Sequence, residues 1–269
     1  MAALSPFDPE GAFAGVDAYR FEVVSRGDFV PGVLYLPPRG RASDKGASDS
    51  APPPASAAPL VLVQHGLAGS KESTYLECAA RWVREGFAVA SVDLPLHGAR
   101  SSPKLSARLI EGVDHVVHDQ SLDPETHALV EEFARQSTSD LVRTLDAISM
   151  LDAIDEGRIG YVGFSLGAVV GTYLLAHDPR ARVAVLALAG GARGPRELDP
   201  AMYIGRGEVR PLLVVAAEDD KRVSVASSRA LFDAARDPKE FLLSPGDHGQ
   251  LSGKTLGRIQ TFLKDEFVR

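Results

Sequence analysis

The chain has 269 residues, 45% of them hydrophobic and 24% charged, with a formal net charge of −7. This composition is that of a soluble globular protein with an ample core, and the mixed charges show no basic patch of the kind that binds nucleic acid. The single cysteine, Cys78, excludes an internal disulfide and is compatible with the reducing cytoplasm, which is the expected location. No secretory signal or membrane span is expected, because no run approaches 18 apolar residues and the N-terminal stretch is interrupted by prolines and acids.

Short apolar runs alternate with helix-like segments along most of the chain. Residues 20–37 predict a hairpin of two strands around Arg26-Gly27-Asp28. Residues 38–58 are rich in Pro, Ser, Ala and Gly and predict a mobile loop, because they offer little apolar surface to bury. Further strands are predicted at 59–64, 87–92, 159–163, 182–189, 212–217 and 240–243, and helices at 72–85, 125–154 with a break near 136–139, 166–176, 224–236 and 251–267.

This order of elements predicts an α/β fold in one domain, residues 1–269. Apolar strands that alternate with helices are typical of a mostly parallel central sheet with helices on both faces, and the leading hairpin adds antiparallel strands at one edge. Two segments, 98–124 and 190–209, have no clear place in the sheet. We expect them to form a small cap over a site.

A candidate nucleophile lies between a predicted strand and a predicted helix. Residues 163–167 read Gly-Phe-Ser-Leu-Gly, a G-x-S-x-G pattern. The spacing has a steric reason, since Ser165 must occupy a tight, strained strand-to-helix turn, and the flanking glycines let the strand and helix approach closely. A Gly-Ser turn with a purely structural role is the alternative. The apolar strand before the motif and the apolar helix after it favour a nucleophile.

A serine hydroxyl requires a histidine base that is itself oriented by a carboxylate. In folds with such a turn the chain order is serine, acid, histidine, and only His248 follows both Ser165 and the later acids. Three carboxylates follow the predicted strand at 212–217, and composition does not separate them: Glu218, Asp219 and Asp220.

The oxyanion of an acyl-transfer reaction needs two backbone N–H donors. One is expected from Leu166, the residue after the nucleophile, and the other from Leu67, in the loop after the strand at 59–64. His65 and His97 lie in loops that follow strands, and we expect both to be structural.

Four motifs together resemble the α/β-hydrolase superfamily, nearest to its dienelactone-hydrolase-like and prolyl-oligopeptidase-like esterase branches. The resemblance covers about residues 20–269. The motifs are Gln64-His65-Gly66-Leu67-Ala68-Gly69, Asp93-Leu94-Pro95-Leu96-His97-Gly98, Gly163-Phe164-Ser165-Leu166-Gly167 and Pro245-Gly246-Asp247-His248-Gly249. It implies a hydrolase that needs no cofactor and no metal.

The resemblance also selects among the acids. The family's acid motif is similar to G-x-x-D-x-x-V-P, and residues 217–224 match it with Asp220 as the acid. Ala217 replaces the Gly and Ser224 the Pro, which keeps Asp219 as an alternative. Dienelactone hydrolases use a cysteine nucleophile, so this serine-containing chain resembles their fold rather than their chemistry.

The sequence therefore predicts a serine hydrolase that cleaves a small carboxylic ester, with no nucleic-acid or membrane partner. The alternatives are a peptidase, thioesterase or amidase with the same triad, and a non-catalytic ligand-binding protein. Oligopeptidase-like peptidases usually carry a gating propeller, for which this chain has no room, so small esters are favoured. Asp114 and His118, or His115 and His118, could share one helix face and bind a metal. No further ligand at a recognisable spacing supports either pair, so no metal site is expected here. No motif indicates the acyl group, the alcohol or the oligomeric state.

Overall fold

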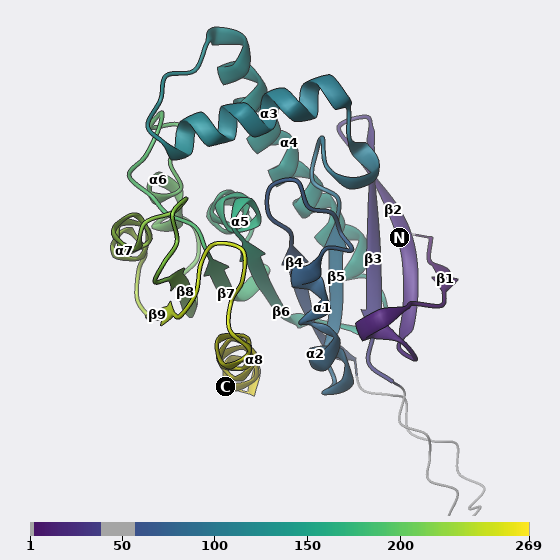
Figure 1. Ribbon diagram of the computed structural model, residues 1–269. Helices are drawn as coiled ribbons and strands as arrows, with labels where there is room; N and C mark the ends of the chain where they lie inside the picture. The colour runs from purple at the N-terminus through teal and green to yellow at the C-terminus, as the bar shows by residue number, and fades with distance from the viewer. Residues whose placement is uncertain (1–2, 39–56, 269) are drawn as a thin grey trace, which may run out of the picture.

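The computed structural model describes residues 3–38 and 57–268, which form one nine-stranded sheet with helices on both faces (Figure 1). The strands are β1 (Ser5–Phe7), β2 (Asp17–Ser25), β3 (Asp28–Leu36), β4 (Ala58–Gln64), β5 (Ala88–Val92), β6 (Ile154–Phe164), β7 (Ala181–Ala187), β8 (Leu212–Ala217) and β9 (Lys239–Ser244). The helices are α1 (Thr74–Glu77), α2 (Ala80–Arg84), α3 (Pro103–Val117), α4 (Pro124–Ile148), α5 (Leu166–His177), α6 (Ala201–Ile204), α7 (Val225–Ala234) and α8 (Gly253–Val268), with short 3₁₀ turns at Gly11–Phe13 and Gly98–Arg100.

The sheet combines a parallel majority with an antiparallel edge. Its strand order is β1-β2-β3-β5-β4-β6-β7-β8-β9. Neighbouring strands from β5 to β9 in this order pair in parallel. The pairs at the other edge are antiparallel: β1 with β2, β2 with β3, and β3 with β5. The predicted fold class is confirmed, including the hairpin at the edge. Arg26 and Gly27 form its two-residue turn with φ of 50° and 85°, the left-handed pair that matches the twist of antiparallel strands.

Two apolar cores lie on opposite faces of the sheet. Helices α4, α5 and α7 pack on one face, where Leu141, Leu145 and Leu174 are fully buried. Helices α2 and α8 pack on the other, where Trp82 and Phe262 are buried. Burial on both faces explains why the central strands read as continuous apolar runs rather than as an alternating pattern.

Some predicted elements differ from the structure. The helix expected at 72–85 is two short helices, α1 and α2, and the long helix α4 runs without the break expected near 136–139 and ends at Ile148 rather than near 154. Asp123 begins α4 by accepting the N–H groups of Glu125 and Thr126. The chain then turns early into β6, which explains the shorter helix.

Both segments that lacked a sequence assignment contain helices. Segment 98–124 holds α3, and segment 190–209 holds the short α6. Figure 1 shows α3 lying across the top of the molecule, above α5. Most of the predicted loop 38–58 lies outside the described residues, and Ala58 is already the first residue of β4. Across residues 3–38 and 57–268, no helix has the length and apolar character needed to cross a membrane.

Candidate active site

Ser165 occupies the sharp turn between β6 and α5. Its φ of 52° and ψ of −116° place a non-glycine residue in a strained backbone region. A Cβ on Gly163 would lie 2.5 Å from the Gly167 carbonyl oxygen, and one on Gly167 would lie 2.6 Å from the Gln64 carbonyl oxygen. The G-x-S-x-G spacing is therefore a steric requirement here, because the turn leaves no room for side chains on either glycine.

The structure brings Ser165, His248 and Asp220 into one hydrogen-bonded chain. The Ser165 hydroxyl lies 2.8 Å from His248 Nε2, and His248 Nδ1 lies 2.7 Å from Asp220 Oδ2. A carboxylate accepts the Nδ1–H, which leaves Nε2 as the acceptor for the serine hydroxyl. His248 sits in the loop after β9, so elements 83 residues apart in sequence meet at the end of the sheet.

Asp220 is the carboxylate that reaches the histidine. Its Oδ1 accepts the backbone N–H groups of Arg222 and Val223, both at 2.8 Å. Burial alone raises the pKa of this carboxyl, but the hydrogen bonds from His248 and from the two backbone groups outweigh burial and lower the pKa. Glu218 and Asp219, the other two candidates, are exposed.

Both residues predicted to supply the oxyanion donors line the same cavity as Ser165. Leu166 is the first residue of α5, so its N–H has no acceptor within the helix. The loop that carries Leu67 runs against the turn, because a Cβ on Gly66 would lie 3.3 Å from Ser165 Cβ. The Gly66 carbonyl accepts hydrogen bonds from the Gly69 N–H and from His65 Nδ1. Because the peptide between Gly66 and Leu67 is trans, the Leu67 N–H points in the direction opposite to this carbonyl.

His65 holds this loop and is fully buried at 2% exposure. Its Nδ1–H donates to the Gly66 carbonyl at 2.8 Å, and its Nε2 accepts the Leu94 N–H at 3.2 Å. Burial lowers the pKa of His65 to about 4, so the ring is neutral near pH 7. These contacts indicate that His65 has a structural role in this loop. Burial likewise lowers the pKa of His97, whose Nδ1 lies 2.8 Å from the Pro95 carbonyl.

Asp93 joins the end of β5 to the same loop. This fully buried carboxylate accepts the Lys71 backbone N–H at 2.7 Å, the Lys71 ammonium at 3.0 Å and the Ala99 N–H at 2.9 Å. A Cβ on Gly98 would lie 2.2 Å from Asp93 Oδ1, and Gly98 has a φ of 53°. The second sequence motif, residues 93–98, therefore supports the loop rather than the reacting atoms.

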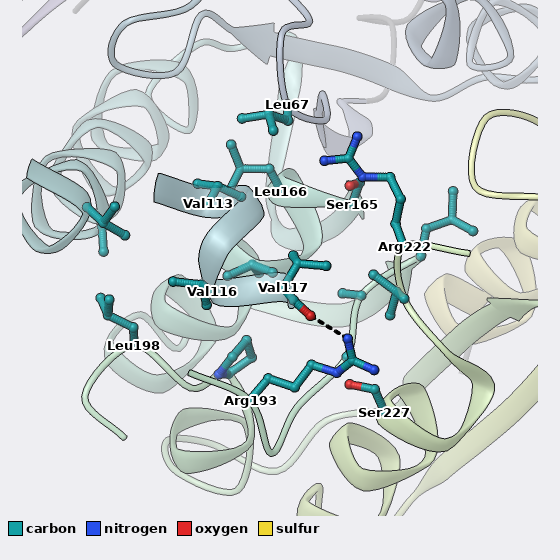
Figure 2. Close-up of a pocket in the computed structure, with 18 of the residues that line it drawn as sticks. Leu67, Val113, Val116, Val117, Ser165, Leu166, Arg193, Leu198, Arg222 and Ser227 are labelled. Carbon is teal, nitrogen blue, oxygen red and sulfur yellow. Dashed lines mark hydrogen bonds between the residues drawn. The ribbon is translucent and has the colours of Figure 1, made fainter. Parts of the chain in front are cut away.

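An apolar cavity opens beside Ser165 and His248 (Figure 2). Helix α3 contributes Val113, Val116 and Val117, and the segment after β7 contributes Arg193 and Leu198. Further apolar lining residues are Leu67, Val130, Phe133, Leu166, Val169 and Leu188. Both segments that have no place in the sheet, and that the sequence led us to expect as a cap over a site, thus contribute residues to this cavity.

Sequence reasoning missed the lining residues on α3 and in the segment after β7. The signal on α3 was available, since Val113, Val116 and Val117 recur at helical spacing on one face. Arg193 and Arg222 carried no sequence signal, because an arginine in a loop is ordinarily a solvated surface group.

Asp114, His115 and His118 do not gather as a metal-binding group in the described part of the chain. His118 Nδ1 lies 2.8 Å from the Asp114 backbone carbonyl, one turn back on α3.

Among the described residues, three other side chains of kinds that can bind a metal lie together, with ligand atoms within 4.8 Å of one another: His127, Glu131 and Glu197. His127 Nε2 lies 2.9 Å from Glu197 Oε1, which ties the segment after β7 to α4. All three side chains are at least 30% exposed, and this tie accounts for their proximity.

Comparison with known proteins identifies the fold independently. The family model for the alpha/beta hydrolase fold matches residues 59–210, more than half of the chain. A comparison with curated protein sequences gives no match.

Solved structures with the same fold include several that are named as esterases. A PEG-bound cold-adapted esterase from an Arctic intertidal metagenomic library is 23% identical, with a TM-score of 0.74 over 98% of this chain and 99% of that chain. The acetyl xylan esterase from Paenibacillus sp. R4 is 15% identical, with a TM-score of 0.71 over 99% and 89% of the two chains. Acetyl xylan esterase 1 from Thermoanaerobacterium sp. JW/SL YS485 is 16% identical, with a TM-score of 0.68 over 98% and 87%. The family model and the shared architecture place this chain in the α/β-hydrolase fold family.

Proposed function

We propose that this protein hydrolyses small carboxylic esters through an acyl-enzyme on Ser165. The observation that carries the proposal is the hydrogen-bonded chain from Ser165 through His248 to Asp220, which ends in an apolar cavity. A nucleophile, a base and a group that orients the base are the three parts that acyl transfer requires. A cavity of this kind accepts the apolar part of an ester.

The first half-reaction forms the acyl-enzyme. Ser165 Oγ forms a bond to the ester carbonyl carbon while its proton passes to His248 Nε2, and the carbonyl oxygen takes the negative charge. The N–H groups of Leu67 and Leu166 are the proposed donors to this oxyanion. The bond between the carbonyl carbon and the alcohol oxygen then breaks, and the departing oxygen takes the proton from His248.

The second half-reaction repeats these steps with water. His248 removes a proton from water, the resulting hydroxide oxygen bonds to the acyl carbon, and Ser165 leaves with the proton returned by His248. Asp220 stabilises the imidazolium in both halves, and its lowered pKa keeps it ionised at neutral pH. Every proton is moved by these side chains and the reaction needs no redox partner, so the mechanism requires no cofactor and no metal.

The names of the structural neighbours favour an ester over the other acyl compounds. The three solved structures compared above are all named as esterases, and two of them are acetyl xylan esterases. A peptidase, thioesterase or amidase would use the same triad, and a ligand-binding protein would not need it. We also infer that residues 1–269 form one domain, with segments 98–124 and 190–209 as its cap, because both segments line the cavity.

A panel of 4-nitrophenyl esters, thioesters and amides tests the proposal. The wild type should hydrolyse the esters fastest, and Ser165→Ala should lower kcat by roughly 10⁴- to 10⁶-fold, as for other triads. A fluorophosphonate should label the wild type and leave this variant unlabelled. Ser139→Ala, a change at a partly exposed serine of α4, is the matched control and should keep both properties. Undiminished ester hydrolysis by Ser165→Ala would refute the assignment of Ser165 as the nucleophile.

A further inference from the structure

One cation lines the apolar cavity away from the reacting serine. Figure 2 shows Ser165 on one side of the cavity and Arg193 on the other, with Val116 and Val117 between them. Arg193 lies in the segment after β7, so its guanidinium reaches the cavity from a different element than the valines of α3. An ester bound with its carbonyl at Ser165 would extend along valine side chains towards this guanidinium.

Arg193 differs from Arg222, the other arginine that lines the cavity, in the partners of its guanidinium. Its two terminal nitrogens donate to the Val117 carbonyl at 2.5 Å and to Ser224 Oγ at 3.0 Å, both uncharged acceptors. Among the described residues, no carboxylate forms an ion pair with it. Arg222, by contrast, pairs with Asp114 at 3.3 Å and is 44% exposed.

A partly buried guanidinium normally finds an anion, because its desolvation in an apolar setting is unfavourable unless it is paired. The group has five N–H donors in a planar fork, and its hydrogen bonds to Val117 and Ser224 leave three of them for another acceptor. A carboxylate fits this fork better than a neutral oxygen does, and the charge-assisted bonds are about twice as strong as neutral ones. The cavity therefore has the chemistry of an anion site at the end of an apolar channel.

We propose that the substrate is an ester that carries a carboxylate at the far end of an apolar chain, and that Arg193 binds this carboxylate while Ser165 attacks the carbonyl. This inference rests on the proposed esterase function and names its substrate class. The apolar lining between Ser165 and Arg193 suits a short aliphatic chain that carries the carboxylate to the guanidinium.

A purely structural role for Arg193 makes a different prediction. Its two contacts join the end of α3 to Ser224, the residue that begins α7, so its loss could loosen the cap. Loosening would impair every ester to a similar extent. Loss of an anion site would impair only esters that carry the carboxylate, and chiefly through KM.

The test compares 4-nitrophenyl hydrogen adipate with 4-nitrophenyl heptanoate, which have similar length and differ in the terminal charge. Arg193→Gln should lower kcat/KM for the adipate by about 10- to 100-fold, the range for a hydrogen bond to a charged group, and leave the heptanoate within about threefold. Arg193→Lys should recover part of the loss because it retains the charge. Arg196→Gln removes the same charge from an exposed position of the same segment and should change neither substrate.

A second pair of substrates places the carboxylate on the alcohol side: the butanoate ester of 6-hydroxyhexanoate and heptyl butanoate, followed by titration of the released acid. A selective loss in either pair supports the anion site and shows which half of the ester occupies it. The proposal is overturned if Arg193→Gln lowers kcat/KM equally for the charged and the neutral ester, or leaves the ratio of their kcat/KM values unchanged. Fluorophosphonate labelling of each variant shows that the site is intact. If the wild type hydrolyses none of the four esters, the esterase function itself fails, which is a separate result.

Discussion

The buried imidazole of His65 makes the stability of the fold depend on pH. The ring must be neutral in the folded state, because its Nε2 accepts the Leu94 N–H and its surroundings exclude water. Burial lowers its pKa from the ordinary value of 6.5 to about 4 on folding. The unfolded chain therefore binds more protons than the folded chain between these two values, and protonation in that window favours unfolding.

The size of the effect follows from the two pKa values. The stabilising contribution of neutral His65 is complete above about pH 6.5 and is lost as pH falls towards about 4. Between about pH 7.5 and about pH 5 the loss is about 2 kcal/mol. The lowered pKa of Asp220 acts in a lower window, because an acid with a depressed pKa contributes stability that is lost only as pH falls below its unfolded value of 3.8.

Urea unfolding at a series of pH values measures this contribution. The single tryptophan, Trp82, is 2% exposed and reports unfolding by fluorescence. His65→Asn should be less stable near pH 7.5, because the Leu94 N–H loses its acceptor, but its stability should fall less steeply with pH. The wild-type slope should exceed that of the variant by about 1.2 kcal/mol per pH unit near pH 5.5. Val63→Ala, a buried change on the adjacent strand with no titratable group, is the control for destabilisation alone. If the free energy of unfolding fell with pH equally steeply for the wild type and for His65→Asn, the assigned role of His65 would be wrong.

Two further substitutions test the site and its turn. Asp220→Asn should lower kcat for ester hydrolysis by about 10⁴-fold, since the imidazole loses the carboxylate that sets its tautomer, whereas Asp219→Asn should stay within a few-fold; the reverse order would make Asp219 the acid. Gly167→Ala should destabilise the fold by more than about 2 kcal/mol in urea unfolding, because its Cβ would lie 2.6 Å from two backbone oxygens. Gly257→Ala, on α8 with nothing within 4 Å of the added Cβ, should instead stabilise by about 0.5–1 kcal/mol, and equal effects of the two changes would contradict the steric argument.

The parts of the molecule that sequence predicted are those in which backbone geometry dictates residue type. The turn at Ser165 needs glycine on both sides, and the central strands must be apolar because helices cover both faces. Such constraints act over a few neighbouring residues and can be recognised in the chain itself. The fold class and the strand-turn-helix context of Ser165 were predictable for this reason.

The choice of acid required tertiary structure. Glu218, Asp219 and Asp220 are consecutive carboxylates in one turn, and composition does not distinguish them. What distinguishes Asp220 in the structure is its orientation, set by two backbone N–H groups that hold one oxygen while the other faces His248. That orientation arises from the path of the turn, and only the resemblance to a family motif anticipated it.

The cavity was not predictable because its walls come from segments that have no motif. The full length of helix α3 was not assigned from the sequence, although Val113, Val116 and Val117 form one apolar face. The proposed role of Arg193 depends on its having no ion pair with a carboxylate of residues 3–38 or 57–268, which no local pattern encodes. In the proposed mechanism, the three reacting side chains and the turn follow from steric rules that other chains of this fold can share. The proposed substrate choice depends instead on which side chains lie opposite Ser165 in the cavity, and among these we propose that the charge of Arg193 distinguishes one ester from another.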